Sequence, residues 1–108
     1  MLLIDTNVFL EYKKLKLFFR SRELLITEPC LLEVEKIARK KKDSLLPKLI
    51  KNIKVIETKE KSGDNSIIEA AKKYNILVAT FDKILMKSLG EEGVKVLSSN
   101  KNILSYLS

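Results

Sequence analysis

The sequence contains no histidine among its 108 residues, and this absence removes whole classes of chemistry. Without imidazole, no Ser-His-Asp or Cys-His catalytic group and no histidine-held zinc site can form. Any catalysis must therefore use carboxylates, lysines, hydroxyls or a hard metal ion bound through oxygen atoms.

Cysteine is also scarce, since Cys30 is the single one and no disulfide can form within the chain. Cys30 stands beside Leu31 in an apolar run, which favours a buried thiol in a protein of a reducing compartment. No apolar stretch is long enough to span a membrane, and the opening residues lack the basic leader of a signal peptide. We therefore expect a cytoplasmic protein with no membrane partner.

Composition indicates one globular domain over residues 1–108, because 45% hydrophobic residues are enough to build a core. The chain has 21 Lys and Arg against 14 Asp and Glu, a formal charge of +7. Basic surfaces attract phosphate backbones, so nucleic acid is the first partner to consider. Basic character also serves solubility alone, and charge is therefore supporting information only.

Short apolar runs alternate with segments of helical periodicity along the whole chain. The runs predict five strands, at 2–4, 23–27, 54–57, 76–80 and 94–98. The intervening segments predict helices at 8–21, 30–42, 44–51, 65–75 and 82–92, with a final helical turn within 100–108. This alternation is typical of an α/β fold in which helices cover both faces of a parallel sheet. Ligands of such sheets bind at the carboxyl ends of the strands, where strand order reverses.

Three aspartates fall at the places where such a site is expected. Asp5 follows the first predicted strand, Asp82 follows the fourth, and Asp64 stands at the start of the helix between the third and fourth. Each one taken singly is better explained as a helix N-cap. Together they would repel one another, and a divalent cation such as Mg²⁺ or Mn²⁺ would relieve that repulsion.

A fourth acid is offered by the second predicted helix, but periodicity leaves two choices. Glu33 and Glu35 lie about 100° to either side of Val34, the centre of the apolar stripe. Glu35 is placed to pair with Arg39 at i,i+4, which makes it the better surface candidate. Helical geometry alone does not decide between the two glutamates.

Four segments, LLIDTN, EPCLLEVEK, GDNSIIEAAKKYN and LVATFDKILMKSL, together resemble the motifs of the PIN domain family of nucleases. The resemblance covers nearly the whole chain. It implies a three-layer α/β/α sandwich with a five-stranded parallel sheet in the order 3-2-1-4-5. It also implies a metal-dependent endoribonuclease in which Asp5, Glu33, Asp64 and Asp82 hold one or two Mg²⁺ or Mn²⁺ ions, so that Glu33 is favoured over Glu35.

The resemblance also assigns supporting roles and shows departures. Asn7 and Thr80 match polar positions that orient carboxylates or water, and each is alternatively a local cap, Asn7 of its helix and Thr80 of its strand end. Asn65 stands where the family often has a second acid, and Phe81 where a polar residue is common. Asn65 makes a second metal ion less certain than the first.

The ending DKILMKSLGEEGVKVLSS looks more like the PIN domains of ribosomal RNA processing than like the toxins of type II toxin and antitoxin pairs. A toxin-type ribonuclease is the alternative. The expected partners are therefore RNA, a second copy of the chain, and an antitoxin or ribosome-assembly factor. Candidates for guiding RNA past the acidic site are the basic residues Lys13, Lys14, Lys16, Arg20, Arg39, Lys40, Lys41 and Lys42.

Two other functions fit parts of the sequence. A PIN-like module without catalysis would bind RNA or protein and keep the fold, and the complete set of acids argues against it. A receiver-like signalling domain also places Asp and Thr at strand ends, but its phosphoacceptor should close the third strand, where Glu57 stands instead.

Overall fold

The computed structural model describes residues 1–12, 24–42 and 53–107. The helix expected at 44–51, most of the one expected at 8–21, and the basic residues Lys13, Lys14, Lys16 and Arg20 lie outside this description. None of the helices in the described ranges is long and apolar enough to cross a membrane.

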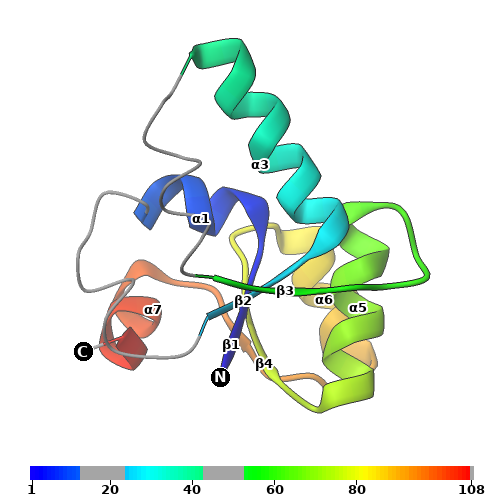
Figure 1. The fold of residues 1–108 in the computed structure, drawn as a ribbon. Coiled ribbons are helices and arrows are strands. Elements are labelled where there is room, and N and C mark those ends of the chain that lie inside the picture. The colour runs from blue at the N-terminus through cyan, green and yellow to red at the C-terminus, as the bar shows by residue number, and fades with distance from the viewer. Residues whose placement is uncertain (13–23, 43–52, 108) are drawn as a thin grey trace.

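Five parallel strands form one sheet in the order β3-β2-β1-β4-β5, as expected from the family resemblance (Figure 1). The strands are β1 Leu2–Ile4, β2 Leu24–Thr27, β3 Lys54–Ile56, β4 Leu77–Ala79 and β5 Val96–Leu97. Leu2, Leu3 and Ile4 are all fully buried, because the central strand β1 is covered on both faces. Strands β2 and β3 are added on one side of β1 and strands β4 and β5 on the other, so the strand order reverses between β1 and β4, which pair directly. The switch point therefore lies where the acids were expected to meet.

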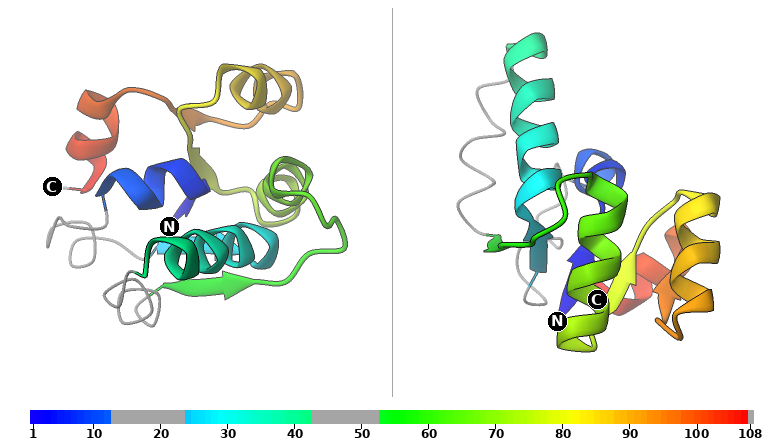
Figure 2. Two further views of the ribbon diagram at one scale, coloured as in Figure 1. Left: turned by 90° about the horizontal axis from the view of Figure 1, so that it is seen from above. Right: turned by 90° about the vertical axis from the view of Figure 1, so that its right-hand side faces the viewer.

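Helices cover the sheet on both sides (Figure 2). They are α1 Thr6–Tyr12, α3 Glu28–Lys41, α5 Gly63–Tyr74, α6 Lys83–Glu91 and α7 Asn100–Leu107. Helices α5 and α6 lie on one face, and α1 and α7 lie on the other (Figures 1 and 2). Helix α3 packs against α1 and α5 and projects beyond the carboxyl ends of the strands.

Capping side chains explain where the helices begin. Thr27 caps α3 by accepting a hydrogen bond from the Cys30 N–H (3.4 Å), and the first turn contains Pro29. Helix α3 therefore starts two residues before the predicted position. The predicted final turn is a full helix, α7, which buries Ile103 and Leu107 in the core.

Candidate active site

Asp5 lies at the carboxyl end of β1 and is almost completely buried, with 7% of its surface exposed. Its backbone N–H donates to Ala79 O of β4 (3.1 Å), which ties the residue to the switch point. The two carboxylate oxygens are both held: Oδ1 accepts from the Thr6 N–H (2.7 Å) and Oδ2 from the Thr80 hydroxyl (2.7 Å). Asp5 therefore has a defined orientation.

Burial raises the pKa of Asp5 above its ordinary value. The hydrogen bonds from Thr80 and Thr6 oppose this rise, and the negative charges of Glu33 and Asp82 add to it. Asp5 thus interacts electrostatically with two of the other three predicted site acids.

Thr80 connects Asp5 to Asp82 from the end of β4. The fully buried Thr80 hydroxyl donates to Asp5 and accepts from the Asp82 N–H (3.1 Å). Asp82 is the N-cap of α6, because its Oδ1 accepts from the N–H groups of Ile84 (2.9 Å) and Leu85 (3.2 Å). The cap uses one oxygen only, so Oδ2 is left for another partner.

Glu33 faces the site from the second turn of α3. Its Oε2 accepts from the Thr6 hydroxyl (2.9 Å), whose own backbone N–H binds Asp5. Glu35 instead lies 3.7 Å from Arg39 in the i,i+4 ion pair that the sequence indicated. Tertiary contact thus distinguishes the two glutamates that helical periodicity left equivalent.

Asp64 is exposed on the first turn of α5. The capping alternative was wrong for this residue, because the N-cap of α5 is Ser62, whose hydroxyl accepts from the Asn65 N–H (3.3 Å). The pKa of Asp64 is raised, first by partial burial of the carboxyl group and then by the charges of Asp82 and Asp5. This coupling places Asp64 within electrostatic reach of both aspartates.

The remaining predicted residues lie around this cluster. Asn7 is exposed in the first turn of α1, which begins at Thr6, so the interpretation of Asn7 as a helix N-cap was wrong. Phe81 is partly buried against the core. The exposed basic run at 39–42 ends α3, the helix that projects past the carboxyl ends of the strands (Figure 1).

Thr6, Gly63 and Cys30 complete the site, and the sequence analysis did not single out the first two. A Cβ atom built on Gly63 would lie 2.6 Å from Glu33 Oε1, so the glycine leaves room for that carboxylate. Cys30 is fully buried beneath them, and burial raises the pKa of its thiol, which therefore stays protonated near neutral pH. The signal available for Thr6 was its place between a strand-end acid and a helix start.

The donor set suits a hard divalent cation, because it consists of carboxylate and hydroxyl oxygens and the only thiol is buried and protonated. In the described ranges, no three acidic or thiol side chains are arranged so that they would hold one ion together. Mg²⁺ commonly keeps several waters and takes only one or two carboxylates, so this arrangement is compatible with it. Burial is the main cause of the raised pKa values of Asp5 and Asp64, and the negative charges of neighbouring acids add to it; a cation would neutralise that added charge.

Comparison with known proteins gives a relative in sequence and several in structure, two of which follow. The chain is 33% identical over 107 residues to "Ribonuclease VapC9" of Archaeoglobus fulgidus, a match that covers 97% of this chain and 67% of that protein. A PilT N-terminus domain protein of Sulfolobus solfataricus has a similar fold, with a TM-score of 0.69, 17% identity and coverage of 96% of this chain and 91% of that one.

The PIN domain endonuclease Utp24 is similar in fold as well, with a TM-score of 0.67, 22% identity and coverage of 94% of this chain and 86% of that one. No family model matches the sequence. At these identities the two structural likenesses concern the fold alone.

Proposed function

The chain belongs to the PIN-domain family of nucleases, and from this premise we propose that it is a Mg²⁺- or Mn²⁺-dependent endoribonuclease that hydrolyses RNA phosphodiester bonds. The observation that carries the proposal is the position of Asp5. Hydrogen bonds link its carboxylate to Glu33 through Thr6 and to Asp82 through Thr80. Besides burial, the negative charges of Glu33 and Asp82 help to raise the pKa of Asp5. Besides burial and the charge of Asp82, the charge of Asp5 in turn helps to raise the pKa of Asp64. All four acids are thus coupled around one strand end.

The residues of the chain have separable tasks in this reaction. A divalent ion bound here would supply Lewis-acid activation of water and neutralise charge on the phosphate. Asp5 and Asp82 are the proposed primary ligands, with Thr80 orienting both, and Glu33 contributes directly or through water. The attacking water forms a new O–P bond while the P–O bond to the leaving ribose oxygen breaks. The proton of the attacking water passes to a carboxylate, and the leaving ribose oxygen takes a proton from a solvent water. We assign the proton of the attacking water to Asp64, whose carboxylate is exposed on the first turn of α5 and therefore open to water.

The surface charge around the site provides a route for RNA. The basic end of α3, Arg39 to Lys42, lies six to nine residues beyond Glu33, which is about 9–14 Å along a helix. Helix α3 projects past the carboxyl ends of the strands, so its basic end lies at the same edge of the sheet as the strand end that carries Asp5 (Figure 1). These basic side chains would attract a phosphate backbone that the carboxylates alone repel.

The biological role has two candidates. The whole-chain similarity to a ribonuclease of VapC type favours a toxin-type ribonuclease with an antitoxin as partner. The final segment, DKILMKSLGEEGVKVLSS, resembles the PIN domains of ribosomal RNA processing. This resemblance favours a processing role, with a ribosome-assembly factor as partner. Two experiments separate them. Growth arrest on induced expression of the wild type, but not of Asp5→Asn, supports the toxin role. Accumulation of an uncut ribosomal RNA precursor in a deletion strain supports processing.

The experiment that tests the activity is cleavage of a labelled single-stranded RNA by purified protein with Mg²⁺, Mn²⁺ or EDTA. Cleavage should require the metal and disappear in Asp5→Asn and Asp82→Asn. Both proteins should fold, because Asn retains a carbonyl oxygen at Oδ1 for the backbone N–H groups that each aspartate binds. At position 5 the Thr80 hydroxyl would accept from the new amide instead of donating to Oδ2.

Glu33→Gln and Glu35→Gln form a matched pair on one helix. Only Glu33→Gln should reduce the cleavage rate, since Glu35 pairs with Arg39 away from the acids. A well-folded wild-type protein that cuts none of a varied set of RNAs with either metal would instead favour the non-catalytic module.

A further inference from the structure

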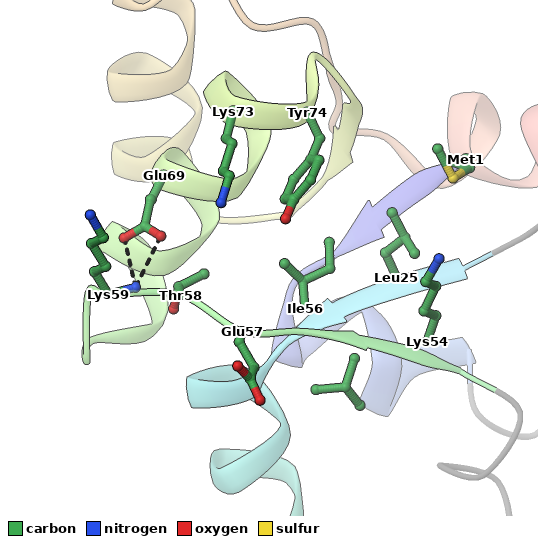
Figure 3. Close-up of a pocket in the computed structure, with 11 residues that line it drawn as sticks. Met1, Leu25, Lys54, Ile56, Glu57, Thr58, Lys59, Glu69, Lys73 and Tyr74 are labelled. Carbon is green, nitrogen blue, oxygen red and sulfur yellow. Dashed lines mark hydrogen bonds between the residues drawn. The ribbon is translucent and has the colours of Figure 1, made fainter.

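A pocket of about 520 Å³ lies between the edge strand β3 and helix α5, and none of the four site acids lines it (Figure 3). Its floor is formed by the buried side chains of Leu25 and Ile56. Tyr74, at the end of α5, stands over this floor with its ring toward the strands (Figure 3). Small-molecule sites commonly have this size and this mainly apolar lining.

Three lysines surround the pocket, and their charges are not taken up by ion pairs. Lys54, Lys59 and Lys73 are all exposed lining residues. Within residues 1–12, 24–42 and 53–107, the salt bridges join other residues, Arg39 with Glu35 and Lys72 with Glu92. The three ammonium groups are therefore available to an anionic ligand.

Of the two carboxylates on the pocket wall, Glu69 has its pKa lowered mainly by hydrogen bonds from backbone N–H groups, and it is near enough to Lys59 and Lys73 for their charges to help lower it, so one carboxylate stands against three ammonium groups. Glu69 accepts from the backbone N–H groups of Lys59 (3.0 Å) and Glu60 (2.9 Å), so it is occupied in holding the loop after β3. Glu57 turns to the opposite side of the strand from Tyr74 (Figure 3). The space above Ile56 is left to the aromatic ring and the lysines.

Tyr74 supplies the feature that separates a nucleotide from a simple anion. Its side chain is 49% exposed, and the Lys73 ammonium lies 5.4 Å from the centre of its ring. Sites for single-stranded nucleic acid combine such elements, since aromatic rings stack on bases while cations bind the phosphates.

An added β-strand from a protein partner is the competing occupant of this edge, and the structure disfavours it. Strand β3 has only three residues, and it begins with the exposed Lys54. Short edge strands that carry lysine are poor templates for pairing with another strand.

We propose that this pocket binds one nucleotide of a single-stranded RNA, with the base against Tyr74 and the flanking phosphates at Lys54, Lys59 and Lys73. The inference rests on the proposed function in one respect, that RNA is the substrate. Tyr74 ends the same helix whose first turn holds Asp64, ten residues or about 15 Å away along the axis. One RNA strand of a few nucleotides therefore spans both places, and the pocket would hold it outside the catalytic carboxylates.

The test uses Tyr74→Trp, because the chain contains no tryptophan and the new ring is a unique fluorescent reporter. In EDTA, titration with a short oligouridylate should quench its emission. Tyr74→Ala, followed by anisotropy of a labelled oligouridylate, should bind about 5- to 100-fold more weakly than wild type. Log affinity falls as log salt concentration rises, and Lys54→Ala and Lys73→Ala should each make this slope shallower by about 0.7. Lys72→Ala is the matched control, since Lys72 neighbours Lys73 but pairs with Glu92 at 3.0 Å, and it should bind like wild type.

Working in EDTA keeps this test separate from catalysis. Quenching by RNA in a protein that never cleaves would overturn the proposed function and leave the pocket proposal standing. Normal cleavage with unchanged KM in Lys54→Ala and Lys73→Ala, together with emission that RNA does not alter, would overturn the pocket proposal alone. Equal quenching by uridine monophosphate would show a free-nucleotide site, and a concentration-dependent emission shift without RNA would show a second copy of the chain in the pocket. Either result overturns the proposal for an RNA strand.

Discussion

Replacing Gly63 with alanine should reduce activity without reducing stability. The new Cβ would stand 2.6 Å from Glu33 Oε1, whereas ordinary contacts begin at 3.4 Å, so the carboxylate must move by about 0.8 Å. Glu33 is the side that gives way, because its long side chain is exposed and Gly63 is helix backbone. The movement is directed away from Gly63 and disturbs the 2.9 Å hydrogen bond from Thr6.

The magnitude follows from opposite effects on the two properties. A misplacement near 1 Å in a catalytic constellation costs on the order of 100-fold in rate, so we expect Gly63→Ala to lower kcat about 10- to 100-fold. Alanine is the better helix former by about 0.5–1 kcal/mol. Complete loss of a hydrogen bond to a charged group costs roughly 1.5–3 kcal/mol, so weakening it by about a third costs about as much as the alanine gains. The free energy of unfolding should therefore change little.

Gly90→Ala is the matched control, because Gly90 also lies in a helix and a Cβ there would meet no atom within 4 Å. We expect it to be slightly more stable than wild type and fully active. The assays are metal-dependent RNA cleavage and urea unfolding of all three proteins. Full activity in Gly63→Ala would refute the packing of Glu33 against this glycine. A large loss of stability together with the loss of activity would refute the prediction that only activity is affected.

Three further outcomes are expected. Asp5→Asn should raise Tm at pH 7. Burial raises the folded-state pKa of Asp5 above its ordinary 3.8, so the stability that the protonated carboxyl provides at low pH is lost as pH rises through the folded-state pKa. Asn stays neutral and avoids this loss. The Tm difference from wild type should shrink toward pH 3.8, and an unchanged difference over that range would contradict it. Thr6→Val should lower kcat about tenfold with little change in KM, since it removes the hydroxyl that binds Glu33 but keeps the N–H that binds Asp5; a change in KM alone would count against a positioning role. Ile103→Ala should cost about 2–5 kcal/mol in urea unfolding, because the side chain is fully buried, and a neutral effect would show that α7 is not part of the core.

Alternation of apolar strands and helices was sufficient to predict the layers, because a parallel sheet buried on both faces requires that pattern. The ends of elements were less predictable. Helix α5 begins at Gly63 and not at Asn65, since the capping side chain belongs to Ser62. Several residues nearby are capable caps, and the sequence does not show which of them takes the role.

Contacts between elements could not be predicted from local pattern at all. Glu33 and Glu35 are equivalent on an isolated helix and differ only because α1 presents the Thr6 hydroxyl to one of them. Thr6 and Gly63 were missed for the same reason. Their importance lies in what α1 and α5 bring next to α3. The place of Thr6 between a strand-end acid and a helix start was the one signal available for it, and the spacing along the chain does not mark Gly63.

Capping and catalysis were treated in the sequence as competing explanations of the aspartates, but for Asp82 they are compatible. Two backbone N–H groups fix Oδ1 of Asp82, and a carboxylate with one oxygen fixed has its other oxygen fixed in direction as well. Asp5 is held still more tightly, by Thr6 and Thr80. Ligands for a metal ion or a phosphate act best when they are oriented before the ligand arrives. For Asp82, the bonds that make it a helix cap are therefore the same bonds that would preorganise it for the proposed reaction.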